Sequence, residues 1–211
     1  MRILILTNYF PPEIGAASHL FYDLSVGLVQ LGHTVTVATG FPRYNIQELP
    51  QNYRDKLFLR ERMHGVDVLR VSIPSLPKRI PILRGVEHLA VGAALTVGGI
   101  LTGRQDVILV YSPPLTIGLS AYLVGLLRRT PFVFNVQDVF PKYAIDAGIL
   151  KSRALIRFFE GMEKFVYRKA RYVTVHSDGN REHLLSKQVP PDTAVTIPNW
   201  VDTDFIAPGD K

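Results

Sequence analysis

Two short segments of the sequence combine residue types that could hold and orient an anionic ligand. The first is the loop Pro11–Ala17, in which Gly15 and Ala16 stand where a predicted helix begins. The N–H groups of the first turn of a helix lack partners within the helix and lie at the positive end of its dipole, so they can bind a phosphate. Gly15 also has a structural alternative, since a glycine lets a loop turn into a helix.

The second segment is Gln137-Asp138, an amide followed by a carboxylate directly after the predicted strand Phe132–Val136. Loops at the carboxyl ends of parallel strands line the ligand crevice of open α/β sheets, so a carboxylate here favours a functional role. The alternative is that Asp138 caps the turn that follows. Because the loop Pro11–Ala17 also follows a predicted strand, we expect both segments at the same edge of the sheet.

Alternating strands and helices must position these two segments. The predicted strands are Ile3–Thr7, Thr34–Thr39, Val66–Val71, Val107–Tyr111, Phe132–Val136, Tyr172–His176 and Ala194–Ile197, with Phe58–Arg62 as a short extra strand. The predicted helices are Ala16–Leu31, Leu83–Thr102, Leu115–Arg129, Ser152–Lys169 and Asp178–Lys187. Most of the strands are too apolar for a sheet with one exposed face. They therefore predict a Rossmann-like, doubly wound α/β fold with a parallel sheet.

Several common kinds of site are missing from the sequence. The first predicted strand, loop and helix contain neither GxGxxG nor GxxxxGK, which disfavours a dehydrogenase or an ATPase. There are no cysteines, and the histidines and acidic residues lack a ligand spacing such as HExxH. We therefore expect no cofactor and no tightly bound metal. The lack of cysteine also suits a reducing, cytoplasmic compartment.

The chain is basic, with a formal net charge of +6 over 211 residues, which indicates an anionic partner. Nucleic acid is disfavoured, because no helix-turn-helix, RRM or OB pattern accompanies the charge. A membrane surface is another option, since Lys78, Arg79 and Arg84 lie just before or at the start of the apolar helix Leu83–Thr102. That helix could dip into one leaflet, or it could be fully buried within the protein.

Five motifs in order resemble the N-terminal domain of GT-B glycosyltransferases of the family 4 type, also called glycosyl transferases group 1. They are the Pro-Pro-Glu-Ile-Gly-Ala-Ala loop, Gly32-His33 with a following Val/Thr strand, Phe41–Tyr44, Gln137-Asp138 and Ile197–Asp202. The resemblance covers essentially the whole chain. It is greatest to WcaI-like and WbuB-like enzymes of bacterial capsule, colanic acid and O-antigen synthesis. Many relatives differ in having Gly-Gly for Gly15-Ala16 and histidine for Gln137.

The resemblance implies a retaining, metal-independent hexosyltransferase that moves a sugar from a nucleotide-sugar to a glycan acceptor on polyprenyl diphosphate. It implies that the N–H groups of Gly15 and Ala16 face the donor phosphate. Asp138, with Gln137, would orient or desolvate the reacting sugar. The implied acceptor contacts are Glu13, Phe41, Tyr44 and Lys142. A lipid-linked acceptor implies that the Lys78, Arg79 and Arg84 region touches the inner face of the plasma membrane.

The resemblance also predicts the domain organisation. Residues 1–198 are expected to form the acceptor-binding domain, and residues 199–211 to begin an interdomain linker with Asn199 and Asp202 in its hinge. Family enzymes continue into a second Rossmann-like domain that holds the nucleotide-sugar, so this chain is expected to be inactive alone. A rival interpretation is a non-catalytic α/β module that docks on an anionic membrane or a protein partner. The linker-like end of the sequence disfavours it.

Overall fold

The fold comes from a computed structural model, which describes residues 1–43, 45–46, 51–74 and 81–201. Four residues predicted to have a functional role lie outside the described residues: Tyr44, Lys78, Arg79 and Asp202. Arg84 falls within a described helix, but its side chain is not described.

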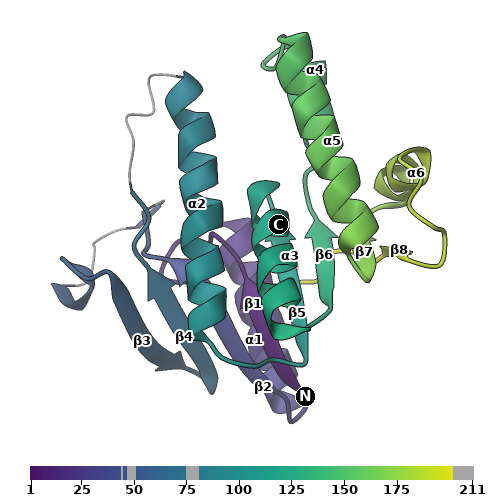
Figure 1. The fold of residues 1–211 in the computed structure, drawn as a ribbon. Helices are drawn as coiled ribbons and strands as arrows, with labels where there is room; N and C mark the ends of the chain where they lie inside the picture. The colour runs from purple at the N-terminus through teal and green to yellow at the C-terminus, as the bar shows by residue number, and fades with distance from the viewer. Residues whose placement is uncertain (44, 47–50, 75–80, 202–211) are drawn as a thin grey trace, which may run out of the picture.

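An eight-stranded sheet runs through the described part of the chain, in the order β3-β4-β2-β1-β5-β6-β7-β8 (Figure 1). Its neighbouring strands are parallel except for the edge pair of β3 and β4, which is antiparallel. The strands are β1 (Arg2–Leu6), β2 (Thr34–Gly40), β3 (Phe58–Met63), β4 (Val66–Val71), β5 (Val107–Ser112), β6 (Phe132–Val136), β7 (Tyr172–Val175) and β8 (Ala194–Thr196). The helices are α1 (Ala16–Gln30), α2 (Pro81–Leu101), α3 (Thr116–Arg128), α4 (Lys142–Asp146), α5 (Arg153–Lys169) and α6 (Asp178–Ser186), with a 3-10 turn at Gln51–Tyr53.

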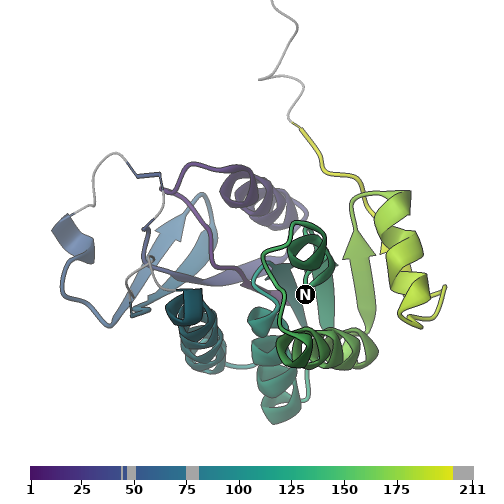
Figure 2. The ribbon, with the colours of Figure 1, turned by 90° about the horizontal axis from the view of Figure 1, so that it is seen from above.

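Helices lie on both faces of the sheet. Helix α1 covers one face, and α2, α3 and α5 cover the other (Figure 2). One core, around Phe21 and Val37, lies under α1, and the other, around Leu95 and Ile117, lies under α2 and α3. The connections that leave the neighbouring strands β1 and β5 therefore go to opposite faces. In open α/β sheets this divergence opens a crevice at the carboxyl ends of the two strands.

The predicted α/β fold class is confirmed, and each predicted strand and helix is present to within two residues. Two short elements were not predicted, namely α4 and the 3-10 turn, which lies in a segment rich in Pro, Asn and Gln. Both are too short to show a helical periodicity in the sequence. The antiparallel edge strand β3 departs from an all-parallel sheet because a tight turn at His64-Gly65 joins it directly to β4.

Helix α2 is only partly buried within the described part of the chain. Leu95 is completely buried, whereas Leu89 and Val97 are 56% and 45% exposed. Five exposed apolar side chains recur at three- or four-residue intervals and form a stripe along the helix, made of Val86, Leu89, Ala93, Val97 and Leu101. Among the described residues, no helix combines the length and the hydropathy that crossing a bilayer needs.

Candidate functional site

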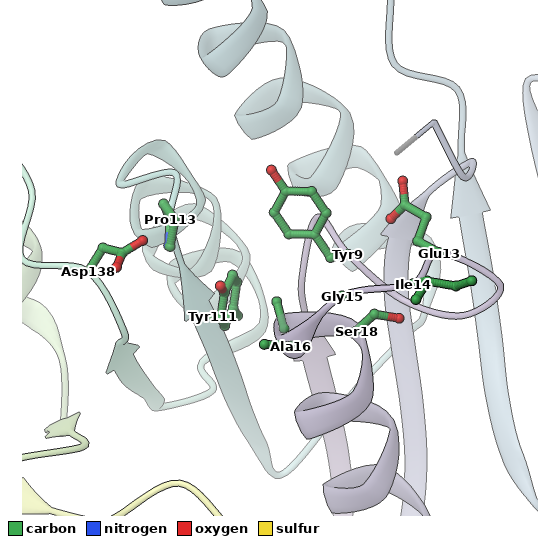
Figure 3. A pocket seen from close by; sticks show the side chains of 10 residues that line it. Tyr9, Glu13, Ile14, Gly15, Ala16, Ser18, Tyr111, Pro113 and Asp138 are labelled. Carbon is green, nitrogen blue, oxygen red and sulfur yellow. The ribbon is translucent and has the colours of Figure 1, made fainter. Parts of the chain in front are cut away.

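A cavity of about 280 Å³ lies at the carboxyl edge of the sheet, where the connections that leave β1 and β5 go to opposite faces. Three strands deliver its walls: the loop after β1 supplies one side, Tyr111 and Pro113 come from β5 and its end, and Asp138 follows β6. In Figure 3, Asp138 lies on one side, the Gly15–Ser18 turn lies on the other, and Tyr111 stands between them. The structure thus brings Glu13, Gly15, Ala16 and Asp138 together at one rim, where the sequence placed them.

The start of α1 faces this cavity without a cap. Gly15 is the N-cap residue, the described part of the chain gives this helix no side-chain cap, and the first turn contains no acidic residue. The first N–H groups of a helix have no internal acceptors, so those at this end are left for a ligand or solvent. Ser18, one turn in, also lines the cavity, and its hydroxyl is buried without a hydrogen-bond partner among the described residues.

The backbone of Gly15 does not require glycine. Its φ of 173° is extended, a conformation that any residue adopts. A Cβ at this position would have no atom within 4 Å. The turn into the helix therefore does not explain why glycine stands here, and its small size mainly keeps space open in front of the helix.

Asp138 is exposed at the cavity wall, and its carboxylate has no hydrogen-bond partner within the described part of the chain. It does not cap the next helix, because α4 begins after Pro141 and has no side-chain cap. Burial raises the pKa of the Tyr111 hydroxyl well above its ordinary value, and the nearby Asp138 charge raises it further. The same two causes, in the same order, raise the pKa of Tyr143. The phenols beside Asp138 therefore stay neutral and can donate hydrogen bonds at physiological pH.

Gln137 is directed elsewhere. Its amide exchanges two hydrogen bonds with the amide of Asn199, at 2.9 and 3.0 Å, and it also donates to Asn135 at 2.9 Å. It does not line the cavity. The expected partnership of Gln137 with Asp138 is replaced by a bond between the β6 end and the segment that follows β8.

A second cavity, of about 320 Å³, shares Tyr9 and Pro113 with the first. Glu13 connects the two regions, because its buried carboxylate accepts a 2.7 Å hydrogen bond from the N–H of Arg43. The Arg43 guanidinium in turn forms a 3.6 Å ion pair with Glu87 of α2. The full lining is Asn8, Tyr9, Arg43, Glu87, His88, Val91, Pro113, Pro114 and Tyr143.

Sequence reasoning missed most of this second cavity. Arg43, Glu87 and Tyr143 come from three separate segments. Glu87 and Tyr143 stand in no motif with a recognisable spacing, and Arg43 lies within Phe41–Tyr44 but was not itself predicted to contact a ligand. The available signal was positional, because Tyr9 and Arg43 follow the carboxyl ends of β1 and β2, where ligand-binding loops gather.

Two of the predicted acceptor contacts are not at either cavity. Phe41 packs edge-on against Tyr53, with 5.8 Å between ring centroids, and lines a separate hollow beside β3. Lys142 forms a 2.7 Å ion pair with Asp146 one turn along α4. The described residues contain no group of histidine and acidic side chains that could hold a metal ion.

A family described as Glycosyl transferase 4-like domain matches residues 15–200 of the chain. No curated protein matches the sequence.

Several solved structures are similar in fold. Sucrose-phosphate synthase from Thermosynechococcus elongatus is 12% identical, with a TM-score of 0.64 over 99% of this chain and 50% of that one. Alr3699/HepE of Anabaena, solved with UDP and glucose, is 15% identical, with a TM-score of 0.59 over 96% of this chain and 45% of that one. The catalytic domain of starch synthase IV from Arabidopsis thaliana, bound to ADP and acarbose, is 15% identical, with a TM-score of 0.58 over 96% and 52%. The chain thus spans about half the length of these three solved structures.

Proposed function

The chain belongs to the glycosyl transferase 4-like family, and from this premise we propose that it forms the acceptor-binding half of a GT-B transferase. In this proposal the enzyme moves a sugar from a nucleotide-sugar to a glycan acceptor in bacterial surface polysaccharide synthesis. Residues 1–198 are the acceptor-binding domain, and residues 199–211 begin a linker to a second domain that holds the nucleotide. The support for a second domain is that the similar solved structures are about twice as long.

The proposal depends on the observation that the uncapped start of α1 and the carboxylate of Asp138 line the same cavity. The N–H groups of Gly15 and Ala16 are donors with fixed positions and a favourable dipole, which suits a diphosphate that gains negative charge as it leaves. Asp138 is suited to the opposite charge, since positive charge develops on the sugar as its bond to the phosphate breaks.

The reaction we propose exchanges one bond at the anomeric carbon. The bond to the phosphate oxygen of the donor breaks, and a bond to an acceptor hydroxyl oxygen forms on the same face of the sugar, with retention of configuration. The hydroxyl proton passes to the departing diphosphate. The protein contributes by holding both reactants in this geometry, with no metal required.

The second cavity is our candidate for the acceptor. It shares the lining residues Tyr9 and Pro113 with the first cavity, so a group bound there lies next to the cavity that Asp138 lines. Its lining suits a sugar, because the Arg43 and Glu87 side chains are planar groups that can bond pairs of hydroxyls, and the tyrosine rings can cover apolar C–H faces. Glu13 supports this wall through its bond to Arg43.

Replacement of Asp138 by Asn in the intact enzyme tests the proposal. We expect transfer to fall by roughly 100-fold with little change in melting temperature, because an exposed carboxylate without partners contributes little to stability. Asp106→Asn is the matched control, since Asp106 pairs with Arg2 at the opposite edge of the sheet. Equal transfer rates in the two variants would remove Asp138 from the mechanism.

The acceptor in our proposal is linked to a lipid, which puts the enzyme at the cytoplasmic face of the membrane. The apolar stripe on α2 supports this, because five exposed apolar side chains along one helix can enter the boundary of a leaflet. The net charge of +6 favours anionic lipid.

Vesicle flotation tests the membrane contact. We expect binding to vesicles that contain phosphatidylglycerol, and its loss in a Leu89→Glu/Val97→Glu variant. Leu31→Glu is the control, because Leu31 is 75% exposed at the end of α1, on the other face of the sheet. If the double variant floats as well as the control does, the stripe is not a membrane contact.

A further inference from the structure

Arg70 of β4 is the largest of the fully buried side chains in the described part of the chain. A buried guanidinium loses its hydration, so it is tolerated only where its charge and its N–H groups find partners. The position therefore needs an explanation that packing alone does not supply, since an apolar side chain would fill the same space more easily.

The partners of Arg70 come from four different segments. Its Nε donates to Oε1 of Glu61 on β3 at 2.5 Å, Nη1 donates to the carbonyl oxygen of Gly40 at 3.4 Å, and Nη2 donates to the carbonyl oxygen of Pro11. The guanidinium also lies 4.9 Å from the ring centroid of Tyr53, whose hydroxyl donates to both carboxylate oxygens of Glu61.

Two of these contacts reach the loops that build the cavities. Pro11 begins the segment that leads to Gly15, and Gly40 ends β2, directly before the segment that carries Arg43. Those two loops are also joined directly, by the bond between the Glu13 carboxylate and the N–H of Arg43. Arg70 thus bonds the main chain where each of the two loops begins, at Pro11 and at the end of β2.

We propose that Arg70 is a positioning residue. It fixes the position of the Pro11–Gly15 loop relative to the sheet, and thereby the orientation of the N–H groups at the start of α1. The proposal rests on the function proposed above. An arginine suits this role because its planar group offers five N–H donors in a fixed arrangement, whereas a lysine is a point charge on a flexible chain.

The test uses a variant in which no buried charge is left unpaired. Arg70→Met/Glu61→Gln removes both charges and keeps an acceptor for the Tyr53 hydroxyl. The folded state of this variant therefore contains no unpaired buried charge that would destabilise it. Arg60→Met is the matched control, because Arg60 also bonds a main-chain carbonyl, that of Leu101 at 2.8 Å, but at the far end of α2.

Amide hydrogen exchange over Tyr9–Ala17 is the first measurement, and it needs no substrate. We expect roughly tenfold faster exchange in this segment for the double variant, with β1 and β4 unchanged and the control like the wild type. Unchanged exchange in the loop, or an equal rise in every element, would overturn the proposal.

Kinetics of the intact enzyme with a panel of nucleotide-sugars separate this inference from the proposed function. A looser loop with a KM for the donor raised about tenfold supports both. A looser loop with unchanged donor kinetics keeps Arg70 as the residue that positions the loop and removes the loop from donor binding. Arg70→Lys is expected to be more stable than the double variant, because it keeps a positive charge beside Glu61. It should slow amide exchange in the loop only slightly, because a lysine side chain cannot reach three acceptors in one plane.

Discussion

Helices α1 and α6 both begin at the carboxyl ends of parallel strands, yet their first turns are completed in opposite ways. In α6 the Ser177 side chain accepts from the N–H of Asn180 at 3.3 Å, and Asp178 lies in the first turn. In α1 the N-cap is Gly15, with no side-chain cap and no acidic residue. The two helix N-termini thus have different roles. The amide groups at the start of α6 are capped and stabilise the protein, and those at the start of α1 remain available to a ligand.

The surroundings of the two helices differ in the same sense. Helix α6 is tied to α5 by Glu163, which is completely buried and lies 3.0 Å from His183 and 3.4 Å from Lys187. Around α1 the polar groups face a cavity instead, as the unpartnered carboxylate of Asp138 does. A buried carboxylate that is paired internally with basic side chains indicates a structural role, and a carboxylate left without a partner at a cavity wall indicates a binding role.

The largest effect is expected when α1 is given the kind of end that α6 has. A Cβ at Gly15 meets no atom within 4 Å, and Gly15→Asp places a carboxylate where the donor phosphate is proposed to bind. Like charges at close range cost several kcal/mol, so we expect the KM for the donor to rise roughly 100-fold. Stability should rise by about 0.5 kcal/mol, because aspartate caps a helix slightly better than glycine does. Donor titrations and thermal melts measure the two effects.

Gly15→Ala is the control for that variant. It adds a methyl group in open space and no charge, so the change in KM should be far smaller. Equal effects of alanine and aspartate would mean that the space, and not the charge, matters at this position.

The next effect concerns Glu163 of α5, whose ion pairs with His183 and Lys187 tie α6 to α5. Glu163→Gln removes the charge that pairs with His183 and Lys187, and we expect the free energy of unfolding to fall by about 2 kcal/mol. Transfer per folded molecule should not change, because Glu163 lines neither cavity. Denaturant titration together with an activity assay checks both statements. If the variant is as stable as the wild type, the ion pairs of Glu163 do not stabilise the packing of α6 on α5.

The pH dependence of stability reports on the same ion pair between Glu163 and Lys187. Burial lowers the pKa of Lys187, but the carboxylates of Glu163 and Glu160 outweigh it, so the folded pKa lies above the unfolded value of 10.5. A raised lysine pKa stabilises the protein fully below pH 10.5, and this contribution is lost as the pH rises through the folded value. Alkaline unfolding of Glu163→Gln should therefore show a smaller loss over that range than the wild type does.

The smallest effect is expected from removing the cap of α6. Ser177→Ala leaves the N–H of Asn180 without its side-chain acceptor and should lower stability by about 1 kcal/mol. The donor KM should stay at the wild-type value. A changed KM would show that the two helix ends are not as distinct as their caps indicate.

Much of the fold could be predicted because each segment carries its own local signal. Apolar runs such as Val107–Tyr111 are long enough to predict strands. Ser177 and Asp178 are both residue types that cap helices, so the pair predicts where α6 begins, and the structure has Ser177 as the cap. The two halves of the first cavity were predictable for a related reason, since Gly15 and Asp138 both follow strands and parallel strands end at one edge. The short helix α4 was not predictable, because five residues show no period.

The sequence alone determined the alternation of elements, the absence of the usual dinucleotide and P-loop motifs, and the shared edge of Gly15 and Asp138. Tertiary structure decided which polar residues meet. It paired Gln137 with Asn199, 62 positions away, and joined Arg70 to Pro11, 59 positions away. The physical reason is that local patterns report the path of the backbone. The partner of a polar side chain depends instead on how distant segments pack, and nothing in the spacing of residues along the chain encodes that.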